Sequence, residues 1–61
     1  MKRQDLIREL EDAGCELDRH GNRHDIYRNP TTRRKAPVPR HREISETLCA
    51  LIRKQLGINP E

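Results

Sequence analysis

The segment DRHGNRHDIYRNP, residues 18–30, indicates a β-hairpin in the first half of the chain, and the other elements of the fold are arranged around this hairpin. Two short runs, CELDR (15–19) and HDIYR (24–28), flank Gly21 and Asn22. Glycine at the first position of a two-residue turn takes a positive φ without a Cβ clash, so this dipeptide suits a tight hairpin. We therefore predict two antiparallel strands that meet at this turn.

The predicted turn determines which residues face each other across the hairpin. The expected cross-strand pairs are Leu17 with Ile26, Asp18 with Asp25 and Arg19 with His24. The first and last of these pairs share the buried side of the sheet. The middle pair brings two carboxylates together, which is unfavourable unless arginines lie between them. A hairpin loop that is shifted by one residue is therefore an alternative.

Amphipathic helices are predicted on both sides of the hairpin. The run QDLIRELEDAG (4–14) has apolar residues at helical spacing and ends in a glycine suited to a left-handed cap. Its apolar residues are Leu6, Ile7, Leu10 and Ala13. The run ISETLCALIRKQLGI (44–58) has the same pattern, with Gly57 as its cap and Ile58 able to fold back onto the last turn. Its predicted buried stripe is Ile44, Leu48, Leu51, Ile52 and Leu56.

The run KAPVPR is predicted to be a third strand at an edge of the sheet. Pro37 and Pro39 remove two backbone donors from one side of this strand, so it pairs only through Ala36 and Val38. The order of helix, three antiparallel strands and helix defines an α+β fold, α-β-β-β-α. Two amphipathic helices can cover only one face of such a sheet, so we expect both helices on that face.

The composition allows only a thin core, because the 61 residues are 31% hydrophobic and include no Trp or Phe. We expect a single domain, residues 1–61, with residues 58–61 as a loose C-terminal tail. Cys15 and Cys49 are expected to be small buried hydrophobic residues, and a single disulfide bond between them is the alternative. No apolar run is long enough for a signal peptide or a membrane span, so we expect a cytoplasmic protein without membrane association.

The charges divide the chain into three parts. Residues 1–18 carry three basic and six acidic groups, residues 19–42 eight basic and one acidic, and residues 43–61 two basic and three acidic. The middle part also holds all three histidines. A solvated basic loop is one interpretation, but so one-sided a block favours a surface that binds an anion such as RNA.

His24 is the candidate for acid–base chemistry within this basic part. No metal or other cofactor is expected, because Gly21 interrupts the helical face that His20 and His24 would have to share. Cleavage of RNA demands little of a protein, because the 2′-hydroxyl beside the phosphate is itself the nucleophile. His24 would remove its proton, and Arg19 opposite would favour the neutral, proton-accepting imidazole. A histidine that only satisfies its own hydrogen bonds at the sheet margin is the alternative.

The other candidates are expected to contact RNA. Tyr27 can stack on an unpaired base or fill the sheet. His20 and His41 are candidate proton donors to the leaving oxygen. The basic side chains are interpreted as phosphate contacts or as solubilising charge. The predicted RNA contacts are Arg19, Arg23, Tyr27, Arg28, Lys35, Arg40 and His41.

Three segments resemble the HicA-type mRNA interferase toxins, the toxin half of HicAB toxin–antitoxin modules. These segments are GNRHDIYRNP (21–30), VPRHREI (38–44) and IRKQLGI (52–58), and with the opening LIRELEDAGCEL (6–17) the resemblance covers nearly the whole chain. It implies a fold similar to double-stranded RNA-binding domains, cleavage of mRNA and growth arrest. It also implies a HicB-type antitoxin as partner, so we expect a monomer when free and a hetero-oligomer with the antitoxin.

The essential histidine of the family corresponds to His24, so the resemblance implies that His24 is catalytic. Two positions depart from the family pattern. Arg23 stands where Ser or Asn is common, and Cys15 stands where a large aromatic or apolar residue is usual. Neither change removes the base, so RNA cleavage is expected. A non-catalytic RNA-binding module and a structural partner subunit are the alternatives.

Overall fold

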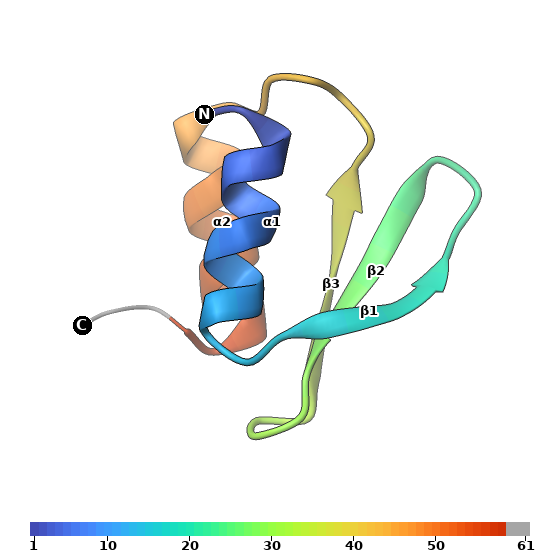
Figure 1. Ribbon diagram of the computed structural model, residues 1–61, viewed down its shortest axis with the longest axis vertical. Coiled ribbons are helices and arrows are strands. Elements are labelled where there is room, and N and C mark those ends of the chain that lie inside the picture. The colour runs from blue at the N-terminus through green and yellow to red at the C-terminus, as the bar shows by residue number, and fades with distance from the viewer. Residues whose placement is uncertain (59–61) are drawn as a thin grey trace.

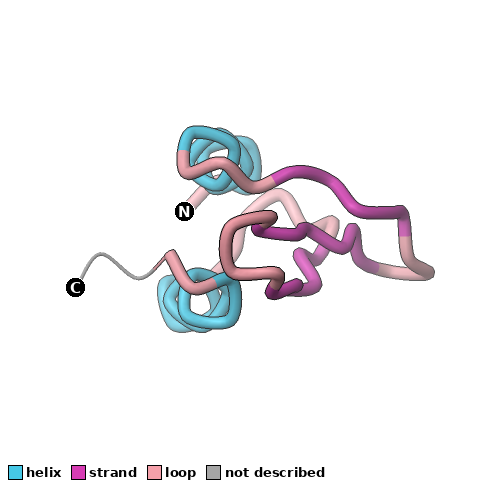
Figure 2. The backbone as a smooth tube through the Cα atoms, turned by 90° about the horizontal axis from the view of Figure 1, so that it is seen from below, coloured by secondary structure: helices cyan, strands magenta, loops and turns pink. Residues whose placement is uncertain are grey.

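The computed structural model describes residues 1–58 and has two layers, one of helices and one of strands (Figure 1). Its elements are α1 (Arg3–Asp12), β1 (Glu16–His20), β2 (His24–Asn29), β3 (Arg34–Pro39) and α2 (Glu46–Leu56). The strands form one antiparallel sheet in the order β1-β2-β3. Both helices lie on the same face of it, as Figure 2 also shows. This arrangement confirms the predicted α+β fold of the α-β-β-β-α type.

The alternating side chains of β2 show which face of the sheet meets the helices. Asp25 and Tyr27 are buried, whereas the residue between them, Ile26, lies on the outer face. On β3, the buried residues Val38 and Ala36 lie opposite Asp25 and Tyr27, as expected for the edge strand that carries the two prolines. The buried core consists of Leu6, Leu10, Cys15, Tyr27, Ala36, Val38, Ile44, Cys49, Ile52 and Leu56.

The hairpin between β1 and β2 is longer than the predicted two-residue turn. Residues 21–23 form its loop, and the pairing is irregular at Asp18. The observed pairs are Glu16 with Arg28, Leu17 with Tyr27, Arg19 with Ile26 and His20 with Asp25. The predicted register was therefore wrong. The observed register also separates the two carboxylates, because Asp25 lies opposite His20 and Asp18 is skipped in the pairing.

The change of register exchanges buried and exposed residues. Tyr27, not Ile26, faces the helices. Leu17 is 42% exposed, and every residue of β1 is exposed, so the predicted burial of Leu17 was wrong. On β2, the changed register places Asp25 and Tyr27 on the face that was predicted for His24 and Ile26. Leu17 lies opposite Tyr27 and shares its face, but it is exposed because β1 is an edge strand that nothing in residues 1–58 covers.

Gly21 is required by a close approach of two backbone segments. It lacks the predicted positive φ. Its N–H donates to the carbonyl oxygen of His24 at 2.7 Å. A Cβ atom at this position would lie 2.8 Å from the same oxygen, a distance at which the hairpin would have to shift. Glycine is needed here because the loop closes directly onto the start of β2.

The C-terminal end of α2 is the predicted glycine cap. Gly57 has a φ of 74°, and its N–H donates to the carbonyl oxygen of Lys54. The N–H of Ile58 donates to the carbonyl oxygen of Arg53 at 3.0 Å, so two terminal carbonyl groups are satisfied. Ile58, expected to begin a loose tail, is half-buried and packs against the core. Residues 59–61 of that predicted tail lie outside the described residues.

The buried face of α2 differs from the predicted stripe at two positions, because Leu48 is only partly buried and Leu51 is exposed. It consists of Cys49, Ile52 and Leu56, whereas Leu51 is 47% exposed, so the predicted burial of Leu51 was wrong. Cys15 and Cys49 are both buried and free. This confirms the expectation that they act as small hydrophobic residues and are not bridged.

Replacing Ser45 by alanine is expected to destabilise the fold by about 1 kcal/mol. The Ser45 hydroxyl accepts a 3.2 Å hydrogen bond from the Leu48 N–H in the first turn of α2, and alanine cannot accept it. Urea unfolding measures the change. Ser45→Asn should retain stability because its side-chain oxygen can accept the same bond. Thr47→Ala is the matched control, and equal midpoints for Ser45→Ala and Thr47→Ala would contradict the capping role.

Candidate functional site

His24 begins β2 on the outer face of the sheet, and its side chain is exposed. It lines an open hollow of about 410 Å³ at the hairpin, together with Arg19, Arg23 and Ile26. Within residues 1–58 its imidazole makes no hydrogen bond, so both ring nitrogens are free to contact a ligand. The fold therefore brings together three of the predicted site residues: the candidate base and two arginines.

Arg40 holds the loop that precedes His24. Its Nη2 donates to the carbonyl oxygen of Gly21 at 2.8 Å, and longer contacts reach the carbonyl oxygens of Asn22 (3.3 Å) and His24 (3.4 Å). Its Nη2 and Nε also donate to one carboxylate oxygen of Asp25 at 2.9 and 3.0 Å. Arg40 was predicted to contact RNA, but its guanidinium group also fixes the hairpin.

Asp25 is the carboxylate around which these cations gather. It is 8% exposed, and its Oδ2 accepts a 2.6 Å hydrogen bond from Nη2 of Arg3 in α1. Its Oδ1 lies 2.8 Å from Nδ1 of His20, a candidate proton donor, and accepts the bonds from Arg40. The sequence did not point to Asp25 as a site residue. The signal that could have found it is that Asp25 is the single acid in the basic part, residues 19–42.

The groups around Asp25 hold the pKa of its carboxyl well below the usual range. The hydrogen bond from Arg40 is the largest cause, and the hydrogen bond with His20 is the second. Burial acts in the opposite direction but is outweighed. The carboxylate therefore stays charged, and keeps its contacts, down to acidic pH.

The stability of the fold is expected to decrease as the pH falls below about 4. Because the pKa of Asp25 is lower in the folded chain, its contribution is complete above the unfolded pKa and is lost as the pH falls toward the folded pKa. Thermal unfolding of the wild type and of Asp25→Asn at a series of pH values measures this. The difference in Tm should be largest near neutral pH and should shrink in acid. A difference that does not change with pH would contradict the role of Asp25.

Three residues that were predicted to contact RNA do not line the hollow around His24. One of them is buried, and the other two form ion pairs. Tyr27 is 7% exposed and packs in the core, because the observed register turns it toward the helices. Its ring therefore fills the sheet, which is the alternative to base stacking. Arg28 pairs with Glu16 at 3.1 Å, and Lys35 pairs with Asp18 at 3.4 Å.

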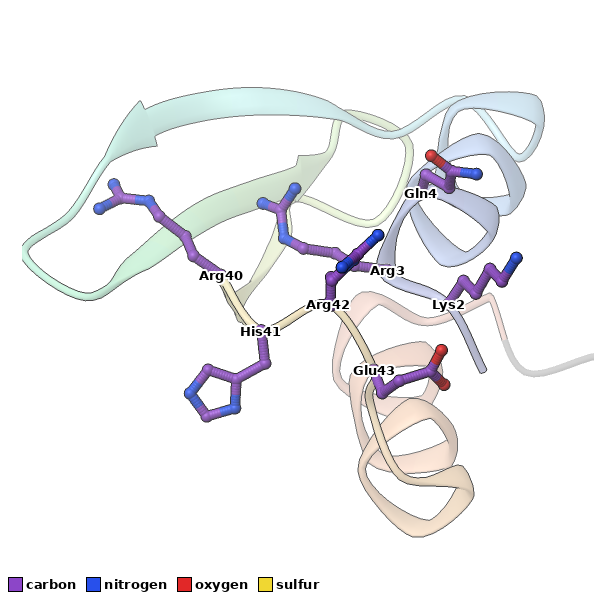
Figure 3. A pocket seen from close by; sticks show the side chains of 7 residues that line it. All are labelled: Lys2, Arg3, Gln4, Arg40, His41, Arg42 and Glu43. Atoms are coloured by element: carbon purple, nitrogen blue, oxygen red, sulfur yellow. The ribbon is translucent and has the colours of Figure 1, made fainter.

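Arg40 and His41 line a second hollow, of about 530 Å³, which the sequence did not predict (Figure 3). It lies between the start of α1 and the segment that connects β3 to α2. We call it the basic hollow because most of the side chains around it are cations. Its lining includes Lys2, Arg3, Arg40, His41, Arg42 and Glu43.

Two further features bear on the kind of site. Among residues 1–58, no group of three or more His, Cys, Asp or Glu side chains is arranged to hold a metal ion. In the same part of the chain, no helix is both long enough and apolar enough to cross a membrane.

The fold and the site define a small basic α-β-β-β-α domain that presents an exposed histidine on a hairpin. The family model described as "HicA toxin of bacterial toxin-antitoxin" matches residues 3–58, nearly the whole chain. The chain therefore belongs to the HicA toxin family. It is therefore a toxin of a toxin–antitoxin system. Toxins of such systems have an antitoxin as partner. No curated protein and no solved structure matches the chain.

Proposed function

We propose that this toxin is an endoribonuclease that cleaves mRNA with His24 as general base. The observation that carries the proposal is the exposed imidazole of His24, without a hydrogen bond in residues 1–58, in a hollow that it shares with Arg19 and Arg23. A general base must reach the proton that it removes, and the phosphate beside that proton needs cations. Membership of the HicA family supports the same activity.

The proposed reaction uses the RNA's own hydroxyl. His24 takes the proton from a ribose 2′-hydroxyl, and the 2′-oxygen forms a bond to the adjacent phosphorus. The bond from this phosphorus to the 5′-oxygen of the next nucleotide breaks, and that oxygen takes up a proton from water. The hydroxide left behind takes the proton from His24, which restores the neutral imidazole. The products are a 2′,3′-cyclic phosphate and a 5′-hydroxyl. Because the substrate supplies the nucleophile, these steps need no metal ion and no cofactor.

The arginines beside His24 act on the phosphate. Negative charge develops on the phosphoryl oxygens as the 2′-oxygen attacks, and Arg19 and Arg23 are placed to offset it. Arg40 is a positioning residue in this proposal, because its hydrogen bonds to the loop hold His24 in place. A histidine that must meet one hydroxyl needs such a fixed hairpin.

The proposed partner is a HicB-type antitoxin that covers the hollow around His24. Covering this hollow would exclude RNA and so neutralise the toxin. We further propose that the free toxin is a monomer that acts in the cytoplasm, where mRNA is found. Mixing toxin and antitoxin should then abolish cleavage as a stable complex forms, which light scattering and a cleavage assay can follow together.

The experiment that tests the proposed function is incubation of the purified protein with labelled RNA in the presence of a chelator. We expect each cleavage to produce one new end with a 2′,3′-cyclic phosphate and one with a 5′-hydroxyl. Binding of RNA without new ends would instead identify a non-catalytic RNA-binding module. Cleavage that appears only with added Mg²⁺ and leaves a 3′-hydroxyl would rule out attack by the 2′-hydroxyl.

A further inference from the structure

We propose that the basic hollow binds a second phosphate of the RNA strand that is cleaved at His24. This inference rests on the proposed function. It adds a binding site for a part of the same RNA strand that lies beyond the phosphate at His24. The ligand is a backbone phosphate of single-stranded RNA, contacted by Lys2, Arg3 and Arg42. Lys2 and Arg3 were not predicted from the sequence to contact RNA, whereas Arg42 was among the basic side chains interpreted as phosphate contacts or as solubilising charge.

Backbone contacts hold the two walls of the basic hollow together. The N–H of Arg3 donates to the carbonyl oxygen of Arg42 at 2.8 Å, and Lys2 forms a β-bridge with Glu43. These contacts join the start of α1 to the segment before α2, which is far away in the sequence. The cations are therefore in place before a ligand arrives, so little ordering of the backbone opposes binding.

The cations of the basic hollow outnumber the carboxylates near it. Lys2 and Arg42 are exposed, and in the part of the chain that the structure describes neither has a carboxylate within ion-pair distance. Arg3 and Arg40 share one carboxylate, that of Asp25. The result is a surplus of positive charge in a concave surface, which attracts an anion.

Figure 3 shows how the remaining side chains of the basic hollow lie. Arg42 extends on the side of Arg3, whereas the ring of His41 points away from both. Glu43 also lines the hollow, but it lies 3.7 Å from the N-terminal amine of Met1, which is a cation of its own. That amine also lies 3.5 Å from Glu46. Even with Glu43 counted, the four cations Lys2, Arg3, Arg40 and Arg42 outnumber the two carboxylates of Asp25 and Glu43. His41 is left out of the proposed phosphate site because its ring points away.

The basic hollow and the hollow around His24 lie at the same end of the sheet. His24 pairs with Pro39, and the next residue, Arg40, lines the basic hollow and has its guanidinium Nη2 3.4 Å from the backbone carbonyl oxygen of His24. A strand whose phosphate lies beside the His24 imidazole would pass this end of the sheet at Arg40 to bring a further phosphate to Arg42. Grooves that bind single-stranded nucleic acid follow the backbone with cations in this way.

The position of both hollows at one end of the sheet favours RNA over an acidic segment of a protein partner. Phosphates recur at every nucleotide, so a strand held at His24 presents another anion without a special sequence. Guanidinium groups also match phosphate oxygens with two parallel hydrogen bonds, and the exposed Arg42 can make both. Arg3 already donates through Nε to the carbonyl oxygen of Pro39 at 2.8 Å and through Nη2 to Asp25, so it adds mainly its charge and its Nη1. An acidic peptide would have to carry its charge at one particular place.

The test compares Lys2→Gln/Arg42→Gln with Arg8→Gln/Lys54→Gln. The second double variant removes the same charge from exposed positions that do not line the basic hollow. Both are made in the His24→Ala background, so that RNA of about 12 nucleotides can be bound without cleavage. We expect Lys2→Gln/Arg42→Gln to weaken binding roughly tenfold relative to its control. A plot of log K against the logarithm of the salt concentration should also become less steep, by about 0.7 for each phosphate that the variant no longer neutralises.

The length of the RNA separates this inference from the proposed function. In the same His24→Ala background, the loss of binding caused by Lys2→Gln/Arg42→Gln should be larger for the long RNA than for a dinucleotide that occupies only the His24 hollow. Equal binding of long RNA by both double variants would overturn the second phosphate site, even if cleavage at His24 is established. A selective loss of long-RNA binding would support the site even if the protein cleaves nothing. A loss of antitoxin binding with unchanged RNA binding would overturn it in favour of a protein contact.

Discussion

His24→Ala is expected to lower the rate of RNA cleavage by about 10²–10⁴-fold, the usual contribution of a general base. Alanine cannot take the proton from the ribose 2′-hydroxyl, although the arginines that share the hollow remain. The imidazole is exposed and makes no hydrogen bond in residues 1–58, so its loss should leave the fold and RNA binding intact. The cleavage rate of a labelled RNA, its Kd and the Tm of the variant are the measurements.

Free imidazole is the control for the missing side chain. It can enter the open hollow, so it should restore part of the cleavage by His24→Ala and leave the wild-type rate unchanged. Expressed in bacteria, the wild type should arrest growth and the variant should not. A variant that cleaves RNA at the wild-type rate would rule out His24 as the base. A lowered Tm would show that the imidazole is a structural group.

Asp25→Asn is expected to lower Tm by about 5 °C or more and cleavage by roughly tenfold to a hundredfold. Asparagine retains the shape but not the charge, so Arg3, His20 and Arg40 lose their common anion. The guanidinium groups are then close together without a counter-charge. Arg40 no longer holds the loop in one position, so His24 is misplaced relative to the 2′-hydroxyl. Circular dichroism and the cleavage assay measure the two effects.

Asp18→Asn is the matched control for this variant. It makes the same change of charge on the same hairpin, but Asp18 pairs with one exposed lysine, Lys35, at 3.4 Å. Exposed ion pairs of this kind contribute little to stability, so Tm and cleavage should change only slightly. Equal losses in both variants would show that net charge, and not the set of contacts around Asp25, causes the effect.

The helices and the edge strand were predictable because their signals are local. In α1 and α2, apolar residues recur at helical spacing and a glycine with positive φ follows each helix. In β3, two prolines leave pairing on one side only, and β3 is an edge of the sheet. Each signal involves residues within a few positions of one another, so no knowledge of distant contacts is needed.

The register of the hairpin was not predictable from neighbouring residues. Asp25 bonds to Arg3, 22 residues away, and to Arg40, 15 residues away. With Asp25 facing the helices, the alternation of β2 places Tyr27 in the core and His24 on the outer face. A local preference for a two-residue turn at Gly21 carries no information on these distant partners.

The sequence by itself determined the order of the elements, the basic middle part and the candidate base His24, because these follow from residue type and local spacing. The tertiary structure was needed to show that Arg40, interpreted from the sequence as an RNA contact, also holds the hairpin. It also decided that Lys2 and Arg42 meet at one hollow. A guanidinium group carries the same charge in either role, and its role depends on which carboxylate or carbonyl group the fold brings within hydrogen-bond distance.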